Sequence, residues 1–284
     1  SVVFEVNSDG TSVPLTIGIR AFMNCTSLEK ITLPARLTDI KLQRYSFDKN
    51  GINTTEGDSA FTGCTALASI AVASNSQNYM AIDSILYSKN GQNLLFVPAS
   101  VQGKFVVPEG TKNIGAGAFI GCHFVTEVTL PGSLVLISEC AFYGLENLEA
   151  LTFNGVALND LEVDKYAFMN CKVLETVTFN EGSRLGKLGD SAFEGCESLK
   201  EFTFAATMSS VGASAFANCT ALQTVNFVAS QRTLSFGENA FMNCTGLKTV
   251  NLPANVSKIP GVFTGCSSLE AVNVDENSQY LTSV

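Results

Sequence analysis

The sequence contains no tryptophan and only one histidine, His123, among its 284 residues. A single histidine leaves little material for catalysis that depends on an imidazole base. Charged residues are also scarce, at 15% against about a quarter in an average soluble domain. The formal net charge is −9, and the 17 Lys and Arg residues form no patch. This balance argues against DNA, RNA or an anionic membrane surface as the partner.

Long apolar runs are missing as well. No run approaches the roughly 18 residues of a membrane-spanning helix, so we expect no membrane span in this chain. No segment has a basic start followed by the apolar core of a secretory signal. Hydrophobic residues nevertheless make up 46% of the chain. This fraction is enough for a large core, which we expect to be covered by Ser, Thr and Asn rather than by charge.

One repeated unit fills most of the chain. The letters AFMNC occur at 21–25, 167–171 and 240–244, and the same pattern recurs in weaker form elsewhere. In eight of nine copies a Cys lies three residues after the Phe, and Leu145 replaces it in the remaining copy. A Leu or Val follows three residues later, and then a short alternating run that ends in Val-x-Leu. The nine phenylalanines are Phe22, Phe61, Phe119, Phe142, Phe168, Phe193, Phe216, Phe241 and Phe263.

The spacing within the unit predicts its local structure. Apolar residues two apart, as in Val-x-Leu, indicate a strand with one buried face. Apolar residues three apart, as in Ala-Phe-x-x-Cys-x-x-Leu, are typical of a short helical or 3₁₀ turn. A unit of about 23 residues cannot bury its apolar face alone, but stacked units can. We therefore predict an α/β solenoid that is rich in strands, with one parallel strand per coil and a continuous spine of stacked phenylalanines.

The unit resembles the leucine-rich repeat of BspA-like bacterial surface proteins. The matching residues run from Ile17 through Ala21-Phe22, Cys25 and Leu28 to Leu33-Pro34, and the likeness extends over nearly the whole chain. The resemblance implies a right-handed leucine-rich-repeat superhelix. It also implies a secreted or cell-surface protein of a host-associated bacterium, adhesin-like and without enzymatic activity.

We expect a single elongated solenoid over residues 1–284. Its first coils occupy 1–72 and carry a loop insertion at 41–58, and a β-hairpin module around Asn90-Gly91 occupies 73–113. Seven regular coils follow at 114–274. The run from Val274 to Tyr280 repeats the pattern of Val72 to Tyr79, so 275–284 is predicted to begin a second hairpin module. More protein is then expected beyond Val284.

The nine cysteines do not predict a metal site or disulfides. They lack the closely spaced pairs of a zinc site, and equivalent side chains in stacked coils point the same way. We expect the eight in the repeat position to be reduced, buried and protected. Cys140 lies outside that column and is predicted to be the most reactive. Cys122 and His123 are adjacent, but neighbouring side chains diverge, so we predict no thiol–imidazole pair, no enzyme and no cofactor.

Two candidate binding regions remain. Part of the 41–58 insertion, with Arg44, Tyr45, Phe47 and Asp48, is either a binding loop or a tolerated surface excursion. The outward side chains of the predicted strands either only solvate the sheet or form a neutral concave surface that binds a ligand. They are Lys30, Thr32, Glu127, Thr129, Thr152, Thr176, Thr178, Glu201, Thr203, Thr224, Asn226, Thr249, Asn251 and Asn273.

The function predicted from these observations is a monomeric, non-catalytic binding module. The resemblance to adhesin-like surface proteins implies that its ligand is a host or microbial protein or a glycan. A structural spacer that presents a neighbouring domain is the alternative. The outward columns lack the Trp, Tyr and Arg that dominate binding hot spots, so tight binding on this face is not favoured.

Overall fold

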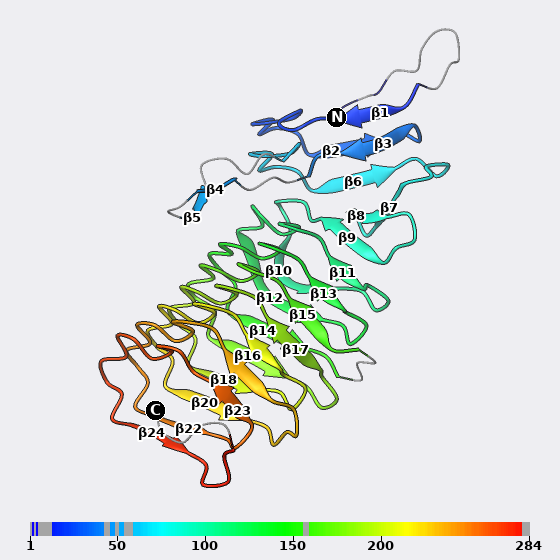
Figure 1. Cartoon of the computed structure of the whole chain (residues 1–284). Coiled ribbons are helices and arrows are strands. Elements are labelled where there is room, and N and C mark those ends of the chain that lie inside the picture. The colour runs from blue at the N-terminus through cyan, green and yellow to red at the C-terminus, as the bar shows by residue number, and fades with distance from the viewer. Residues whose placement is uncertain are drawn as a thin grey trace.

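The computed structural model describes residues 2, 4, 13–42, 46–48, 51–53, 59–155 and 159–279. The coils stack one after another along the chain, from the N-terminal strands to the C-terminal ones (Figure 1). Most strands belong to two rows, which we name the first and second strand rows. The core lies between the rows and is filled by their inward side chains.

The first strand row follows directly from the Leu-x-x-Val-x-Leu pattern. In β2 and β22, for example, exposed and buried residues alternate strictly, as a half-buried strand requires. Strands of successive coils pair in parallel within four separate sheets, because each strand is reached only after a full coil. The row comprises β2 (Lys30–Leu33), β6 (Ser69–Val72), β10 (Gln102–Val106), β12 (Phe124–Leu130), β14 (Ala150–Phe153), β16 (Thr176–Phe179), β18 (Glu201–Phe204), β20 (Thr224–Phe227), β22 (Thr249–Leu252) and β24 (Ala271–Val274).

The second strand row was not predicted. It consists of shorter strands that precede each Ala-Phe turn, and most of them form one sheet of ten strands. Short parallel strands such as β13 and β15 are paired over only two residues. The sheet comprises β7 (Tyr79–Ile82), β8 (Ile85–Ser88), β9 (Asn93–Phe96), β11 (Asn113–Ile114), β13 (Leu136–Ile137), β15 (Leu161–Val163), β17 (Leu185–Leu188), β19 (Ser210–Val211), β21 (Leu234–Phe236) and β23 (Val256–Lys258), and β1 (Leu15–Ile17) pairs with β3 (Leu37–Ile40) at the N-terminal end.

The predicted α/β class is therefore wrong. Across the described residues no helix is present, each regular coil carries two parallel strands rather than one, and the chain is a β-solenoid of about ten turns. The reason lies in residues with positive φ, which a right-handed helix cannot contain: one before the Cys position in all nine coils, and one before the Ala-Phe or Val-Phe pair in eight of them. Those before the Cys position are Asn24, Gly63, Gly121, Gly144, Asn170, Gly195, Asn218, Asn243 and Gly265.

The Ala-Phe segment forms a third hydrogen-bonded side of each coil. The Phe168 N–H donates to the Ala192 carbonyl at 2.8 Å, and Phe193 repeats this bond to Ala215 at 2.7 Å. The apolar residues three positions apart, which are also typical of a helical turn, thus belong to a tight bend. Backbone hydrogen bonds of this bend include bonds to the next coil. Each regular coil is thus bonded to the next through this side and through the second strand row, and most are also paired in the first row.

The phenylalanines form a spine, but it is not continuous. Rings stack from Phe119 to Phe263 with centroid distances between 4.4 and 5.7 Å. Phe22 and Phe61 form a separate stack at 5.5 Å. Between the two stacks lies the hairpin module, where Phe61 contacts Phe96 instead. The module therefore divides the aromatic core into two parts.

Residues 73–113 contain three antiparallel strands rather than a single hairpin. β7 and β8 are joined by Asp83 and Ser84, both with positive φ, and β8 and β9 are joined around Asn90-Gly91. The strand β9 then pairs in parallel with β11 and so continues the second row. The module is built into the wall of the solenoid.

Within the 41–58 insertion the structure describes a small antiparallel pair, β4 (Ser46–Asp48) with β5 (Gly51–Asn53). Phe47 and Asp48 belong to β4, whereas Arg44 and Tyr45 lie outside the described residues. At the other end, 275–279 follow β24 as a turn, and 280–284 also lie outside the described residues. The predicted second hairpin module there stays a prediction.

Candidate functional site

The outward side chains of the first strand row form two straight columns. Strand pairing places Thr129 beside Thr152 and Thr152 beside Thr178, and in the second column Glu201 beside Thr224. Because parallel strands are in register, equivalent residues of successive coils become neighbours about 4.8 Å apart. All fourteen residues predicted for this surface lie on the outward face and are exposed or half-buried. The structure thus brings them together on one face.

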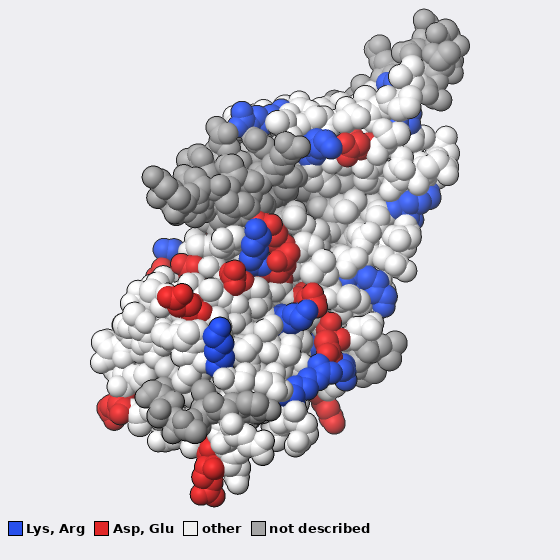
Figure 2. All heavy atoms as spheres, viewed as in Figure 1, with Lys and Arg blue, Asp and Glu red and all other residues white. Residues whose placement is uncertain are grey.

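This outward face carries few charges. The Lys104 ammonium pairs with the Glu127 carboxylate at 2.9 Å across two strands, which neutralises one of the few charged positions. Near the C-terminal end the Asn273 amide donates to the Asn251 side-chain oxygen at 2.8 Å. Figure 2 shows charged atoms scattered over a mostly uncharged surface, with basic and acidic groups side by side. The face therefore presents hydroxyl and amide groups rather than a field of one sign.

Elsewhere the charged residues connect coils to each other. Lys187 pairs with Glu162 at 2.8 Å, and Arg184 pairs with Asp160 at 2.6 Å. Arg232 also binds the Asp160 carboxylate, so one acidic side chain joins three coils. Desolvation raises the pKa of Asp160, but hydrogen bonds from both arginines and their charges outweigh it and leave the pKa below its usual value. These contacts hold the solenoid together.

The cysteine column is structural, but two predictions about the cysteines are wrong: Cys25, in the repeat position, is exposed rather than buried, and Cys140 is buried rather than reactive. Cys196 Sγ donates to the Phe168 carbonyl of the preceding coil at 3.3 Å, and Cys219 does the same to Phe193 at 3.2 Å. All nine cysteines are free thiols and eight are buried. Cys25 is the exposed one, whereas Cys140, predicted to be the most reactive, is fully buried and its pKa is raised by desolvation. The prediction for Cys140 is wrong.

His123 and Cys122 do not form a catalytic pair. The Cys122 thiol points inward, donates to the Val97 carbonyl at 3.5 Å, and has its pKa raised by burial. The His123 ring points to solvent, with Nδ1 at 3.8 Å from a Glu146 carboxylate oxygen. The two side chains therefore face opposite sides of the backbone. No group of three metal-ligating residues occurs among the described residues.

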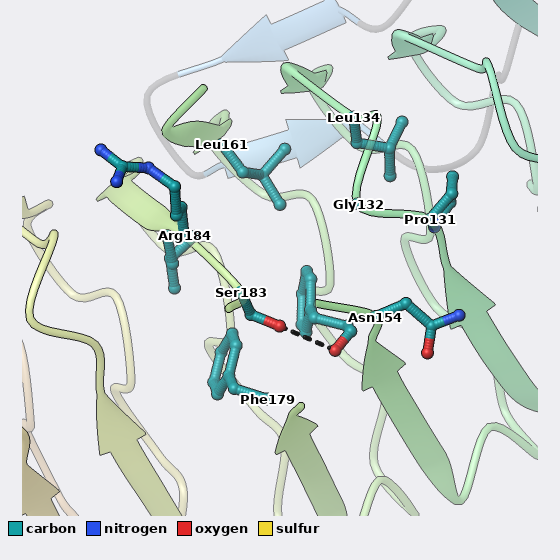
Figure 3. A pocket seen from close by; sticks show the side chains of 10 residues that line it. Pro131, Gly132, Leu134, Asn154, Leu161, Phe179, Ser183 and Arg184 are labelled. Atoms are coloured by element: carbon teal, nitrogen blue, oxygen red, sulfur yellow. Dashed lines mark hydrogen bonds between the residues drawn. The ribbon is translucent and has the colours of Figure 1, made fainter. Parts of the chain in front are cut away.

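A small cavity lies where the first row turns toward the second (Figure 3). Ser183 donates to the Phe153 carbonyl at 2.9 Å beside it, and Phe179 and Leu161 close its apolar side. Its volume of about 20 Å³ has room for roughly one water molecule. This cavity is a packing feature and not a ligand site.

A larger depression was missed by sequence reasoning. It lies at the edge between the Ala-Phe bends and the start of the first strand row, spans three coils, and has a volume of about 770 Å³. At the two positions after the Cys column, its rim carries His123, Glu146, Lys172 and Val173, where most other coils carry Ser, Thr, Ala or Gly; this signal is visible in the sequence. It is lined by Ile120, Gly121, His123, Tyr143, Gly144, Glu146, Asn170, Lys172 and Val173.

Comparison with known proteins bears on family and fold. A family model described as a BspA type leucine rich repeat region of six copies matches residues 11–102, 95–185 and 161–283. No curated protein matches the chain. In the parts of the chain that the structure describes, no helix is long and apolar enough to cross a bilayer.

Two solved structures share the fold. One is a leucine-rich repeat protein from Eubacterium ventriosum, 20% identical, with a TM-score of 0.60 over 88% of this chain and 56% of that one. The other is the pneumococcal vaccine antigen PcpA, 17% identical, with a TM-score of 0.58 over 95% of this chain and 61% of that one. The chain thus spans less than two thirds of either. Since the family model matches most of its length, this chain belongs to the BspA-type leucine-rich-repeat family.

Proposed function

We propose that this chain is a non-catalytic, adhesin-like binding module of a secreted or cell-surface protein. It engages a protein or glycan ligand through the outward face of the first strand row. The observation that carries the proposal is the pair of outward columns, mostly Thr and Asn with few charged residues, which parallel pairing holds in register. Family membership supports the surface location and the absence of catalysis.

The geometry of this face suits a broad, modest interaction. Its side chains are short, so little conformational entropy is lost when a ligand orders them. Thr and Asn offer both donors and acceptors, which match peptide groups and sugar hydroxyls alike. The buried halves of the same strands fix the backbone, because Val128 and Leu151 are fully enclosed in the core. Without Trp and with few charges, affinity would come from many weak contacts rather than from one anchor.

The test is binding of the whole chain to immobilised extracellular-matrix proteins and host glycans. We expect saturable binding to at least one of them. Thr152→Arg together with Thr178→Arg places two large cations on neighbouring strands of the face, and we expect it to weaken binding by roughly tenfold or more. Both positions point away from the core, so the fold is retained. Thr65→Arg together with Thr245→Arg, at two exposed positions outside the two columns, is the matched control.

A second comparison separates the face from the 41–58 insertion. Unchanged binding after deletion of residues 41–58 supports the outward face as the binding surface. Loss of binding only in the deletion variant would show that the 41–58 loop binds the ligand instead. If no partner binds saturably, the binding module is contradicted and the structural spacer is favoured.

A further inference from the structure

Around the depression beside the first strand row, several successive coils depart from the residue types that the other coils carry at the same repeat positions. At the position after the Cys column, five coils carry Thr or Ser: Thr26, Thr65, Thr220, Thr245 and Ser267. The coils around the depression instead carry His123, Glu146 and Lys172, and Glu197 follows in the next coil. The packing of the solenoid does not require these larger side chains, since the other coils fold with Thr or Ser there.

The neighbouring column departs from the rule in the same coils. It contains small residues in six coils, namely Ser27, Ala66, Ser198, Ala221, Gly246 and Ser268, but Phe124, Asn147 and Val173 beside the depression. Phe124, next to His123 in the sequence, is 58% exposed. Tyr143 is the only aromatic residue at the position that follows Ala-Phe. Three positions of the repeat thus change together in one area.

The contacts in the depression organise its walls. The Asn170 amide donates to the Tyr143 hydroxyl at 3.1 Å, and the Asn147 amide donates to the His123 carbonyl at 2.6 Å. Glu146 lies 3.8 Å from the His123 ring, beyond hydrogen-bond distance, so its carboxylate keeps acceptor capacity. Gly144 leaves the centre open, because nothing lies within 4 Å of the place where its Cβ would be. The result is a hollow with a fixed aromatic wall and polar sides.

These features define the chemistry of a matching ligand. The Lys172 ammonium pairs with the Glu197 carboxylate of the next coil at 3.0 Å, so the hollow holds no uncompensated cation. The Glu146 carboxylate disfavours an anionic ligand, and the two observations together favour an uncharged one. Glu146 and Lys172 together offer acceptors and donors within one small area, and the Tyr143 ring offers an apolar surface. The volume of about 770 Å³ falls in the ordinary range for small-ligand pockets, about 300–1,000 Å³.

A peptide fits the hollow less well. Binding of an extended peptide relies on unpaired backbone groups of a strand edge. Here the Gly144 N–H donates to the Met169 carbonyl at 2.9 Å, and the Asn170 N–H donates to the Glu194 carbonyl at 2.8 Å. These backbone groups beside the depression are therefore already hydrogen-bonded to the next coil, so a ligand would be bound by side chains alone.

We propose that the depression bounded by Tyr143, Glu146 and Lys172 is a subsite for an uncharged oligosaccharide. The inference rests on the proposed binding function and gives it a ligand class. The sugar ring packs on Tyr143, and its hydroxyl groups donate to Glu146 and accept from Lys172. The site lies next to the start of strands β12, β14 and β16, so a longer glycan would extend from it onto the outward face.

The experiment uses the whole chain and a defined set of sugars: lactose, N-acetyllactosamine, cellobiose, maltotriose and chitotriose, with sialyllactose as the acidic comparison. Calorimetric titration or saturation-transfer NMR measures binding. We expect saturable binding of at least one neutral sugar, weakened roughly tenfold by Glu146→Gln and by Tyr143→Ala. Thr245→Ala, which changes the repeat position equivalent to Lys172 three coils away, is expected to leave binding unchanged.

Glu146 is an exposed residue, so Glu146→Gln tests the site without risk to folding even if Tyr143→Ala is unstable. The proposal is overturned if no neutral sugar binds, if only sialyllactose binds, or if Glu146→Gln binds as the unchanged chain does. It is also overturned if these variants abolish binding of a protein or peptide and no sugar binds. A partner whose binding is lost only with the Thr152 and Thr178 substitutions would preserve the proposed function while this inference fails.

Discussion

At the scale of single residues, the Asn or Gly before each Cys explains why the bend is not a helix. Nine coils place a residue with positive φ there, and Asn and Gly are the residues that tolerate it best. In this light AFMNC is the sequence of a bend: Asn sets the backbone, Phe fills the spine and Cys bonds to the preceding coil. The motif is repeated because every coil needs the same bend.

We predict that Asn218→Ala destabilises the chain by about 1–2 kcal/mol, the cost of holding a residue with a Cβ in a left-handed conformation. Asn218 has φ of 61°, and its side-chain oxygen also accepts a bond from Asn243 at 3.0 Å. Asn218→Gly is the matched control, because it loses the same side chain but tolerates the backbone. Urea unfolding measures both free energies, and equal losses in the two variants would contradict the role of φ.

Thiol accessibility gives a second prediction at this scale. In the folded chain we expect a thiol reagent to label Cys25 rapidly and the other eight cysteines only on unfolding. Burial raises the pKa of Cys171 to about 12, so raising the pH from 7 to 9 should not speed its reaction. Mass spectrometry of labelled peptides makes the measurement. Rapid labelling of any cysteine in the buried column would contradict the stacked arrangement.

At the scale of elements, the second strand row depends on close contact between coils. Gly189, Gly212 and Gly237 follow three successive strands of that row, and each N–H donates to the coil before it at 2.7 to 2.8 Å. A Cβ on Gly212 would lie 2.4 Å from the Asp190 nitrogen. A glycine at this position therefore indicates close contact between coils after a strand of the second row, although the spacing of these glycines alone did not predict the strands.

We predict that Gly212→Ala costs about 1–3 kcal/mol, since the added methyl group must push two coils apart. Gly18→Ala is the control: nothing lies within 4 Å of its Cβ position and its φ is not positive. Thermal and urea unfolding compare the two variants with the unchanged chain. A Gly212→Ala variant as stable as Gly18→Ala would show that the coils are less tightly stacked than described.

The bridge from Asp160 to Arg184 and Arg232 predicts a pH dependence. The pKa of Asp160 is lower in the folded chain than in the unfolded chain, where it is about 3.9. The ionised carboxylate therefore stabilises the fold at pH values above the unfolded-state pKa, and this stabilisation is lost as the pH falls through the folded-state pKa. Asp160→Asn should therefore cost roughly 0.5–1 kcal/mol at pH 7, a modest amount because both arginines are partly exposed, and little at pH 3 or below. Urea unfolding at pH 7, 4 and 3 measures it, and a pH-independent loss would contradict the bridge.

At the scale of the whole molecule, the hairpin module joins two hydrophobic cores. In β8, Ile85 and Tyr87 belong to the larger C-terminal core, whereas Leu86 between them belongs to the smaller N-terminal one. One strand therefore contributes its two faces to different cores. This arrangement connects the first coils to the seven regular ones without a continuous phenylalanine stack.

The sequence predicted the repeat, the first strand row and the outward columns, because apolar residues at every second position are typical of a half-buried strand. It did not predict the second row, since strands such as β13 and β19 have only two residues, which is too short to show a hydrophobic periodicity. The bend was mistaken for a helical turn because its spacing of three is the same in both, and only the positive-φ Asn and Gly residues distinguish them. The depression was missed because it is formed by departures from the repeat.

The central claim is that the outward face of the first strand row is the binding surface, and methyl NMR of threonine tests it most directly. Thr129, Thr152, Thr178 and Thr203 report on the face, and Thr38 and Thr207 report on other parts of the coils. On titration with a matrix protein that binds the chain, we predict shifts or line broadening confined to the first group. Shifts confined to Thr38 and Thr207, or none at saturation, would contradict the claim.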